Sequence, residues 1–309
     1  MMNPPLVSAV IPTRERAEMV LRAVASALRQ SYSNLEVIVV IDGLDGGTAA
    51  ALSTIHDPRL QVIALTKCVG GAGARNAGVA EARGEWIAFL DDDDQWLPGK
   101  IEAQMMLAAS AGCAEPIVSC RFVAQTGAGD YVWPSRLPAE GESISDYLLV
   151  RDGLHRTEGF IATPTILCRK SLLERVPFTS GLKRHQDWDW VLRATREPGA
   201  RVLFCPQALV ECDMRSEYSV SRKSDWRFSL EWIRGMKPAV SARAYASFLT
   251  CHVAWQAAAE GAWPAFFPLL REAAAGGSLR AGDLARYAGF WFTPSSLRRW
   301  ARQHAAGQR

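Results

Sequence analysis

Four consecutive aspartates at positions 91–94 are the feature of this chain with the clearest chemical potential. They follow the apolar run "EWIAFL" at 85–90, which predicts a buried strand. Hard divalent cations such as Mg²⁺ and Mn²⁺ prefer oxygen ligands, and a bound cation offsets the repulsion between adjacent carboxylates. Because Mg²⁺ usually completes its shell with water and substrate phosphates, the run predicts a metal and a phosphorylated substrate. The alternative is a solvated acidic turn.

The elements around this run alternate regularly between strand and helix over the first hundred residues. The apolar pattern of the run 35–42, "LEVIVVID", is continuous rather than alternating, as expected for a strand covered by helices on both faces. This alternation predicts an α/β fold with a mostly parallel, doubly wound sheet and helices on both faces. The predicted strands are 6–12, 35–42, 60–66 and 85–90, and the predicted helices are 17–30, 46–55 and 73–83.

Ligands bind beyond the carboxyl ends of the strands in such a sheet. Three polar clusters follow predicted strands: the segment "PTR" at 12–14, Asp42, and the aspartates 91–94. The topology therefore predicts that these clusters meet at one edge and form a binding site.

The rest of the chain is less regular. Further strands are predicted at 116–125, 159–169 and 200–206, and an amphipathic helix at 187–195. From about residue 225 the sequence becomes helical and rich in Ala, Arg and Trp. We predict a catalytic domain at 1–224, with halves 1–112 and 113–224, and a C-terminal helical region at 225–309.

Composition narrows the functional class. The net charge of +3 gives no argument for a nucleic-acid partner. Seven cysteines without a CxxC pair or zinc-ligand spacing favour a reducing compartment over a disulfide scaffold. No signal peptide and no uninterrupted apolar run of membrane-spanning length is evident, so we expect a cytoplasmic protein.

Four segments in order give the chain a specific resemblance. They are "VSAVIPTRER", "LEVIVVIDGLDGGT", "GGAGARNAGVAEARGEWIAFLDDDDQWLPGKI" and "HQDWDWVLRA". Together they resemble family 2 glycosyltransferases with the GT-A fold, which are inverting enzymes that use nucleotide diphosphate sugars. The resemblance covers about 195 residues, from the first strand through "DWDW".

The resemblance implies a donor site in the first half of the chain. The polar segment after the first strand would contact the nucleotide, and Asp42 would read a base. A carboxylate accepts the N3–H of uracil or thymine, so UDP or dTDP sugars are favoured; the alternative for Asp42 is a turn or helix-cap residue. Arg75 would lie near the nucleotide or only pair with the acidic run. The implied donor-binding residues are Pro12, Thr13, Arg14, Asp42, Arg75, Asp91 and Asp92.

The resemblance assigns Asp93 as the ligand of the Mn²⁺ or Mg²⁺ ion and Asp187 as the general base. A base must lie within hydrogen-bond reach of the acceptor hydroxyl. Asp94 and Trp96 are expected to shape the loop, and Asp189 to be a helix N-terminal residue favoured by the helix dipole.

The chain departs from the family pattern at several positions. Ile41 and Leu44 replace an aspartate and a serine of the family's "DDGS" turn, and Gln186 replaces a glutamate before Asp187. The late histidine of many relatives is absent from "ECDMRSEYSVSR" at 211–222. The completeness of the metal shell is therefore in question, with cationic side chains available to neutralise the diphosphate instead: Arg215, Arg222 and Lys223.

Three other functions compete with a glycosyltransferase. A Rossmann-type binder is disfavoured because the glycine spacing does not match G-x-G-x-x-G. A non-catalytic sugar-nucleotide or glycan-binding module would not need Asp187 together with Asp42 and Asp93. A metal-dependent nucleotidyltransferase would not need a base on an acceptor-facing helix.

The acceptor is expected to be a glycan or glycolipid hydroxyl in polysaccharide biosynthesis. The segment 285–303 interleaves aromatic and arginine residues, which predicts either contact with the inner membrane surface or a helical subdomain that packs on the catalytic domain. The sugar, the acceptor and the oligomeric state do not follow from the sequence.

Overall fold

The computed structural model describes residues 4–127, 129–152, 159–215, 225–276 and 278–293. The chain forms two compact units. The sheet unit comprises Met1–Leu137 and Ile161–Ser216, and the helical unit comprises Pro138–Phe160 and Glu217–Arg309. The segment 138–160 thus groups with the C-terminal helices, although sequence patterns assign it to the first domain. The predicted domain boundary at 224 stays a prediction.

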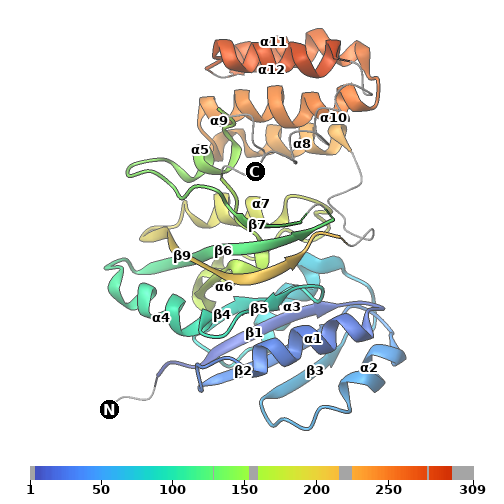
Figure 1. Cartoon of the computed structure of the whole chain (residues 1–309), viewed down its shortest axis with the longest axis vertical. Coiled ribbons are helices and arrows are strands. Elements are labelled where there is room, and N and C mark those ends of the chain that lie inside the picture. Colours follow the sequence, from blue (N-terminus) through green and yellow to red (C-terminus); the bar gives the residue numbers. More distant parts are fainter. Residues whose placement is uncertain (1–3, 128, 153–158, 216–224, 277, 294–309) are drawn as a thin grey trace. The chain divides into compact units, whose positions relative to one another are not determined.

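Nine strands form one sheet within the described part of the sheet unit (Figure 1). Their order is β3-β2-β1-β4-β8-β6-β9-β5, and β7 pairs with β6 outside this path. The strands are β1 (Val7–Thr13), β2 (Leu35–Ile41), β3 (Leu60–Ala64), β4 (Trp86–Phe89), β5 (Gln95–Trp96), β6 (Glu115–Thr126), β7 (Gly129–Trp133), β8 (Leu167–Arg169) and β9 (Ala200–Asp213).

The four strands β3, β2, β1 and β4 are mutually parallel, as the alternating pattern predicts. Every residue of β2 is buried because helices cover it, which explains why six of its seven residues are apolar. The exception, Glu36, accepts hydrogen bonds from Ser8 Oγ and the Arg83 N–H. Since β1, β2 and β4 run in the same direction, their carboxyl ends after Thr13, Ile41 and Phe89 lie at the same edge. The predicted meeting of the three polar clusters is confirmed.

The other half of the sheet is mixed, and two predicted strands differ from the observed ones. The predicted strand 159–169 is wrong over most of its length, because Thr163–Thr165 forms a 3₁₀ turn and only Leu167–Arg169 is a strand. Pro164 lacks the N–H that a central strand needs. By contrast, β9 continues past Pro206 to Asp213, because an irregularity in its pairing with β6 leaves the proline out of register.

Helix α3 shows why the segment "ARNAG" contains a glycine. This helix packs on β1 and β2, and a Cβ atom on Gly78 would lie 2.5 Å from Val10 Cγ1 and 3.1 Å from Val40 Cγ2. A larger residue would therefore push the helix off the sheet. The helices of the sheet unit are α1 (Ala17–Leu28), α2 (Gly46–Leu52), α3 (Gly70–Glu81), α4 (Lys100–Ser110), α6 (Lys170–Arg175) and α7 (Gln186–Ala194).

The helical unit has an aromatic and aliphatic core of its own. A π-helical segment, Phe248–Val253, joins two α-helices into one helical run. The α-helices of this unit are α5 (Ile144–Leu149), α8 (Trp226–Met236), α9 (Ala242–Ser247), α10 (Ala254–Ala259), α11 (Phe266–Gly276) and α12 (Ala281–Phe292). None of the helices in the described ranges is long and apolar enough to cross a bilayer.

Lys100, six residues after Asp94, is fully buried at the start of α4. Its Nζ donates to Gln104 Oε1 at 2.7 Å and lies 4.3 Å from the ring centroid of Trp96. Burial lowers the pKa of Lys100 from 10.5 to about 8. The ammonium contacts the ring of Trp96, which follows the aspartates. The burial of its charge nevertheless lowers the free energy of unfolding at neutral pH.

We expect Lys100→Met to raise the free energy of unfolding at pH 7. A pKa lowered to about 8 means that the unfolded chain binds more protons than the folded chain between pH 8 and 10.5, so the wild type gains stability as pH rises through this window. The charge costs about 3 kcal/mol at pH 7, of which the contact with Trp96 returns up to about 2 kcal/mol. Urea unfolding at several pH values should show that the difference in free energy of unfolding between the variant and the wild type decreases above pH 8. A pH-independent difference would contradict the assignment.

Candidate active site

The acidic segment 91–94 follows β4, and each of its carboxylates has its own partners. Asp92 is buried and accepts hydrogen bonds from Thr13 Oγ1 at 2.8 Å and from Arg16 Nη1 at 2.9 Å. The same nitrogen lies 3.1 Å from Asp93 Oδ2. Burial raises the pKa of Asp92, and burial with the neighbouring carboxylates raises the pKa of Asp93 to about 6. Arg16 thus offsets part of the repulsion at this strand end.

Arg75 on α3 joins the acidic segment to the N-terminus of α7. Its Nη2 donates to Asp91 Oδ1, and its Nη1 donates to Gln186 Oε1 at 2.8 Å. The guanidinium lies 5.7 Å from the ring centroid of Phe178. Arg75 therefore makes the contact with the acidic run that the sequence left open as an alternative. It brings two carboxylate segments together that lie almost a hundred residues apart.

Asp94 holds the loop, as expected from the sequence. Its carboxylate is buried and accepts the backbone N–H of Asp213 at 3.0 Å, which fixes the segment to β9. Burial, together with the charges of Asp91 and Asp93, raises its pKa well above the ordinary value. Trp96 is buried nearby, with Nε1 donating to the carbonyl of Pro164 at 3.0 Å.

Asp187 lies in the first turn of α7, directly after Gln186. Burial raises its pKa to about 6, although the N–H of Trp188, which donates to it at 2.9 Å, and the charge of Arg75 both act in the opposite direction. A carboxylate with this pKa is mostly ionised at pH 7 and still basic enough to take a proton. The residue before α7 is His185, in the left-handed region at φ 60°. Such a backbone is uncommon for a residue other than glycine.

The other side chains of "HQDWDW" have structural contacts. Asp189 accepts from Thr179 Oγ1 at 2.7 Å and pairs with Arg193 one turn later at 2.8 Å. Trp190 is fully buried, and its ring stacks on Phe178 with centroids 5.5 Å apart. The helix-terminal position expected for Asp189 is observed, and Trp190 belongs to the core.

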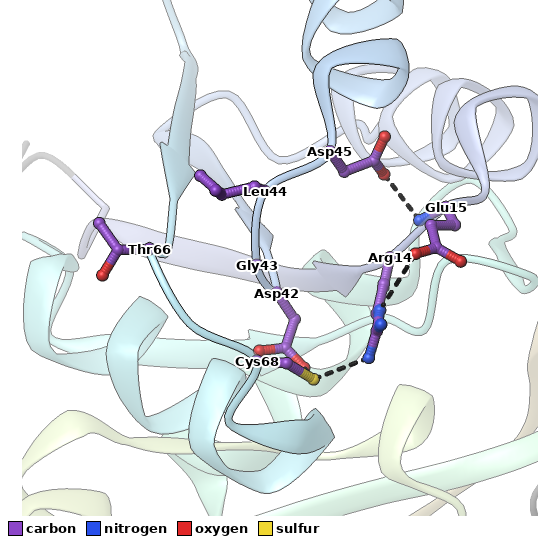
Figure 2. Close-up of a pocket in the computed structure, with 8 residues that line it drawn as sticks. All are labelled: Arg14, Glu15, Asp42, Gly43, Leu44, Asp45, Thr66 and Cys68. Atoms are coloured by element: carbon purple, nitrogen blue, oxygen red, sulfur yellow. Dashed lines mark hydrogen bonds and ion pairs between the residues drawn. The ribbon is translucent and has the colours of Figure 1, made fainter.

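A pocket of about 210 Å³ opens beside the ends of β1 and β2 (Figure 2). Arg14 reaches across it, with Nη1 2.8 Å from Cys68 Sγ. Asp45 accepts the N–H of Glu15 at 2.7 Å and caps α2 by accepting the N–H of Thr48 at 3.0 Å. The pocket is lined by Arg14, Glu15, Asp42, Gly43, Leu44, Asp45, Thr66 and Cys68.

Asp42 holds the loop on one side of this pocket. Its two carboxylate oxygens accept the backbone N–H groups of Val69 at 2.7 Å and Gly70 at 2.9 Å, just before and at the start of α3. This is the capping role that the sequence left open as an alternative to base recognition. The thiol of Cys68 donates a third hydrogen bond, with Sγ 3.2 Å from Asp42 Oδ2. An ionised carboxylate has about four lone-pair sites, so these three bonds still leave acceptor capacity toward the pocket.

The metal-binding capacity of the acidic segment is limited. Across the described ranges, no group of three or more His, Cys, Asp or Glu side chains could hold an ion. Asp93 is only partly buried, and its hard oxygens suit Mn²⁺ or Mg²⁺. One carboxylate completed by substrate phosphates and water is a normal Mg²⁺ arrangement, so the donor set fits such an ion only together with a diphosphate.

Three residues of this region were not identified from the sequence, namely Arg16, Asp45 and Cys68. Arg16 lies three positions after Thr13, at the carboxyl end of the same strand. This position could have identified it as a residue of the site. Cys68 follows β3 on a loop, and only the fold brings it to Arg14. Pro12, the remaining predicted donor residue, lies in β1 opposite Val40 of β2 and is partly buried.

The candidates for neutralising a diphosphate after β9 are only partly described. Arg215 pairs with Asp213, with Nε 3.0 Å from Oδ1, and also donates to Gln125 Oε1 at 3.1 Å. Arg222 and Lys223 lie outside the described residues.

The sequence is similar to a known protein family over more than half of its length. The family model for Glycosyl transferase family 2 matches residues 8–176. The amylovoran biosynthesis glycosyltransferase AmsB of Erwinia amylovora is 30% identical over 247 residues, which are 76% of this chain and 79% of that protein. The UDP-Glc:alpha-D-GlcNAc-diphosphoundecaprenol beta-1,3-glucosyltransferase WfaP of Escherichia coli is 39% identical over 100 residues, 32% of this chain and 40% of that protein.

Solved structures resemble the chain in fold. Residues 1–349 of S. aureus TarS in complex with UDP-GlcNAc align with a TM-score of 0.61 at 16% identity, covering 96% of this chain and 92% of that one. The mannosyltransferase PcManGT of Pyrobaculum calidifontis in complex with GDP-Man and Mn²⁺ aligns with a TM-score of 0.57 at 20% identity, covering 98% and 84%. These alignments confirm the expected GT-A fold with its additional C-terminal helices.

Proposed function

The chain belongs to glycosyl transferase family 2, and we propose that it is an inverting enzyme that transfers a sugar from a UDP- or dTDP-linked donor to a hydroxyl of a glycan or glycolipid. Its activity as a glycosyltransferase follows from the family. Relatives named for amylovoran and teichuronic acid biosynthesis support a role in making a polysaccharide. WfaP, named for a diphosphoundecaprenol-linked acceptor, supports a lipid-linked one.

One observation carries the proposal. Arg75 connects Asp91 to Gln186, so the partly buried Asp187 lies close to the acidic segment that would meet the diphosphate. In the proposed reaction Asp187 accepts the proton of the acceptor hydroxyl as its oxygen attacks the anomeric carbon. The bond from that carbon to the diphosphate breaks on the opposite face, and the configuration inverts.

The donor would lie across the ends of β1, β2 and β4. We place the nucleoside in the pocket beside Asp42 and Arg14, where the remaining lone pairs of Asp42 would accept a uracil or thymine N3–H. Pro12 and Thr13 would border it, and Asp92 would face the ribose. Asp93, with diphosphate oxygens, would hold the Mn²⁺ or Mg²⁺ ion. Such an ion, when bound, offsets the negative charge that develops on the leaving diphosphate.

The seven free cysteines agree with the proposed location in the cytoplasm. A protein that depended on disulfides would pair at least some of them, as secreted domains do.

A donor panel tests this proposal. We expect UDP or dTDP, with their sugars, to raise the melting temperature in the presence of Mn²⁺ or Mg²⁺, and GDP sugars to leave it unchanged. A ligand present at 100 times its Kd stabilises the folded state by about 2.7 kcal/mol, an effect of several degrees for a domain of this size. Stabilisation by GDP sugars alone would contradict the assignment of Asp42.

Turnover separates an enzyme from the alternatives. A sugar-nucleotide-binding module would be stabilised in the same panel but would release no nucleoside diphosphate in the presence of acceptors. A nucleotidyltransferase would release pyrophosphate from a nucleoside triphosphate instead.

A further inference from the structure

Three aromatic side chains of the helical unit are exposed and lie close together. Trp263 is 52% exposed, Phe267 is 77% exposed and Phe292 is 67% exposed. The ring centroids of Trp263 and Phe292 are 5.8 Å apart. Phe266 lies between them and the third ring, with centroids 5.0 Å from Phe267 and 5.6 Å from Phe292. We call these four residues the aromatic cluster.

The aromatic cluster is held by ordered elements. Phe266 and Phe267 begin α11, Phe292 ends α12, and Trp263 lies in the 3₁₀ turn before α11. Behind them, Trp291 is buried with its ring centroid 5.4 Å from that of Trp263. Isolated exposed apolar residues are common, but a contiguous group of large rings on packed helices indicates a surface that meets a partner.

The sequence that follows the cluster indicates which partner. Residues 294–309 contain four arginines and one tryptophan but no aspartate or glutamate, and they begin two positions after Phe292. Tryptophan prefers the boundary between water and lipid, phenylalanine rings bury at the headgroup and acyl boundary, and arginines are attracted to anionic headgroups. An apolar protein surface would explain the rings but would not require the cationic run beside them.

We infer that the aromatic cluster docks the protein on a bilayer that contains anionic lipids. The rings of Trp263, Phe267 and Phe292 enter the headgroup and upper acyl region, and the positive charge of the sequence 294–309 favours anionic over neutral headgroups. Stable anchoring normally requires two such signals, because either one alone gives marginal binding. The inference deepens the proposed function, since docking brings the active site to a lipid-linked acceptor.

This surface differs from the one expected from the sequence alone. The sequence of the segment 285–303 predicts either that this one stretch contacts a membrane surface or that it packs on the catalytic domain as a helical subdomain. In the structure Trp291 packs inside the helical unit whereas Phe292, one residue later, is exposed. The exposed rings that join Phe292 come from residues 263 and 267, which carried no signal of their own in the sequence.

Vesicle flotation with the full chain tests the inference. We expect the wild type to float with vesicles of phosphatidylcholine containing phosphatidylglycerol, and much less with phosphatidylcholine alone. The variant Trp263→Ser/Phe267→Ser/Phe292→Ser should lower the partition coefficient by about 100-fold, because it removes three rings that enter the bilayer. The variant Arg298→Gln/Arg299→Gln/Arg302→Gln should lower it by about 10-fold, and less at high salt. The matched control is Met106→Ser on α4 of the sheet unit, also an exposed apolar residue at 69%, which should float like the wild type.

Two outcomes would overturn the inference. The first is that the wild type fails to float with anionic vesicles. The second is that light scattering shows a dimer of the wild type but a monomer of the triple serine variant, while flotation of the two is the same. The cluster would then be a contact between two copies of the chain. Circular dichroism separates unfolding from lost docking, and the arginine variant tests docking without altering the described helices. Donor binding is measured without lipid, so failure of the proposed function remains distinguishable from failure of docking.

Discussion

Asp187→Asn is expected to lower the turnover number by about 1,000-fold while the dissociation constant for the donor nucleotide changes little. The substitution keeps the size of the side chain and its hydrogen bond from the N–H of Trp188, but it removes the lone pair that accepts a proton. Release of nucleoside diphosphate in the presence of acceptor measures turnover, and calorimetry measures donor binding. Transfer at the wild-type rate would rule out Asp187 as the base.

The pH profile gives an independent readout of the same assignment. Burial raises the pKa of Asp187 to about 6, and a general base acts only when it is deprotonated. Turnover should therefore rise with pH through about 6 and become constant above it. Asp189→Asn is the matched control, because Asp189 lies in the same helix turn but pairs with Thr179 and Arg193. It should reduce stability and leave turnover per folded molecule, and its pH profile, essentially as in the wild type.

The sequence predicts the parallel half of the fold well because local signals and the global fold agree there. Helices cover both faces of β2, so all its residues except Glu36 are apolar, and the helix α3 needs Gly78 to approach Val10. In the mixed half, pairing depends on distant segments. Strand β9 continues past Pro206 because β6 accommodates an irregularity, and no local pattern reveals such a partner.

The candidate site could be predicted as a set of strand ends but not as a set of contacts. Parallel pairing alone places Thr13 and Asp92 at one edge, and their hydrogen bond of 2.8 Å agrees with that expectation. The bridge from Arg75 to Gln186 was not predictable, because it depends on how α7 packs after an irregular stretch. The same holds for Cys68, whose contact with Arg14 joins two loops 54 residues apart.

The acidic segment also shows why four adjacent aspartates are tolerated. Arg75 pairs with Asp91, Arg16 pairs with both Asp92 and Asp93, and Asp94 accepts a backbone N–H. Each carboxylate is thus opposed by a cation or hydrogen-bonded, and the pKa values that rise do so where burial and neighbouring carboxylates exceed this compensation. Of the four, Asp93 shares its one cationic partner with a neighbour, and this leaves it the most available to a further cation.

Asp93→Asn should therefore remove most of the dependence of nucleotide binding on a divalent cation. The wild type is expected to bind UDP or dTDP about 10- to 100-fold more tightly with Mn²⁺ than with a chelator, because the ion joins a carboxylate to the diphosphate. In Asp93→Asn the dissociation constant of the nucleotide measured with Mn²⁺ should approach the one measured with chelator. The dissociation constant measured with chelator should differ little from that of the wild type, because Asp42 and Thr13 remain. Calorimetry gives the dissociation constant for the wild type and for the variant, each with Mn²⁺ and with chelator. A general loss of folding would weaken binding under both conditions and would cancel in their ratio. An unchanged ratio between the two arms would exclude Asp93 as the ligand. Arg16 keeps its bond to Asp92 in this variant, so the acidic segment should stay in place and the loss should be specific to the ion.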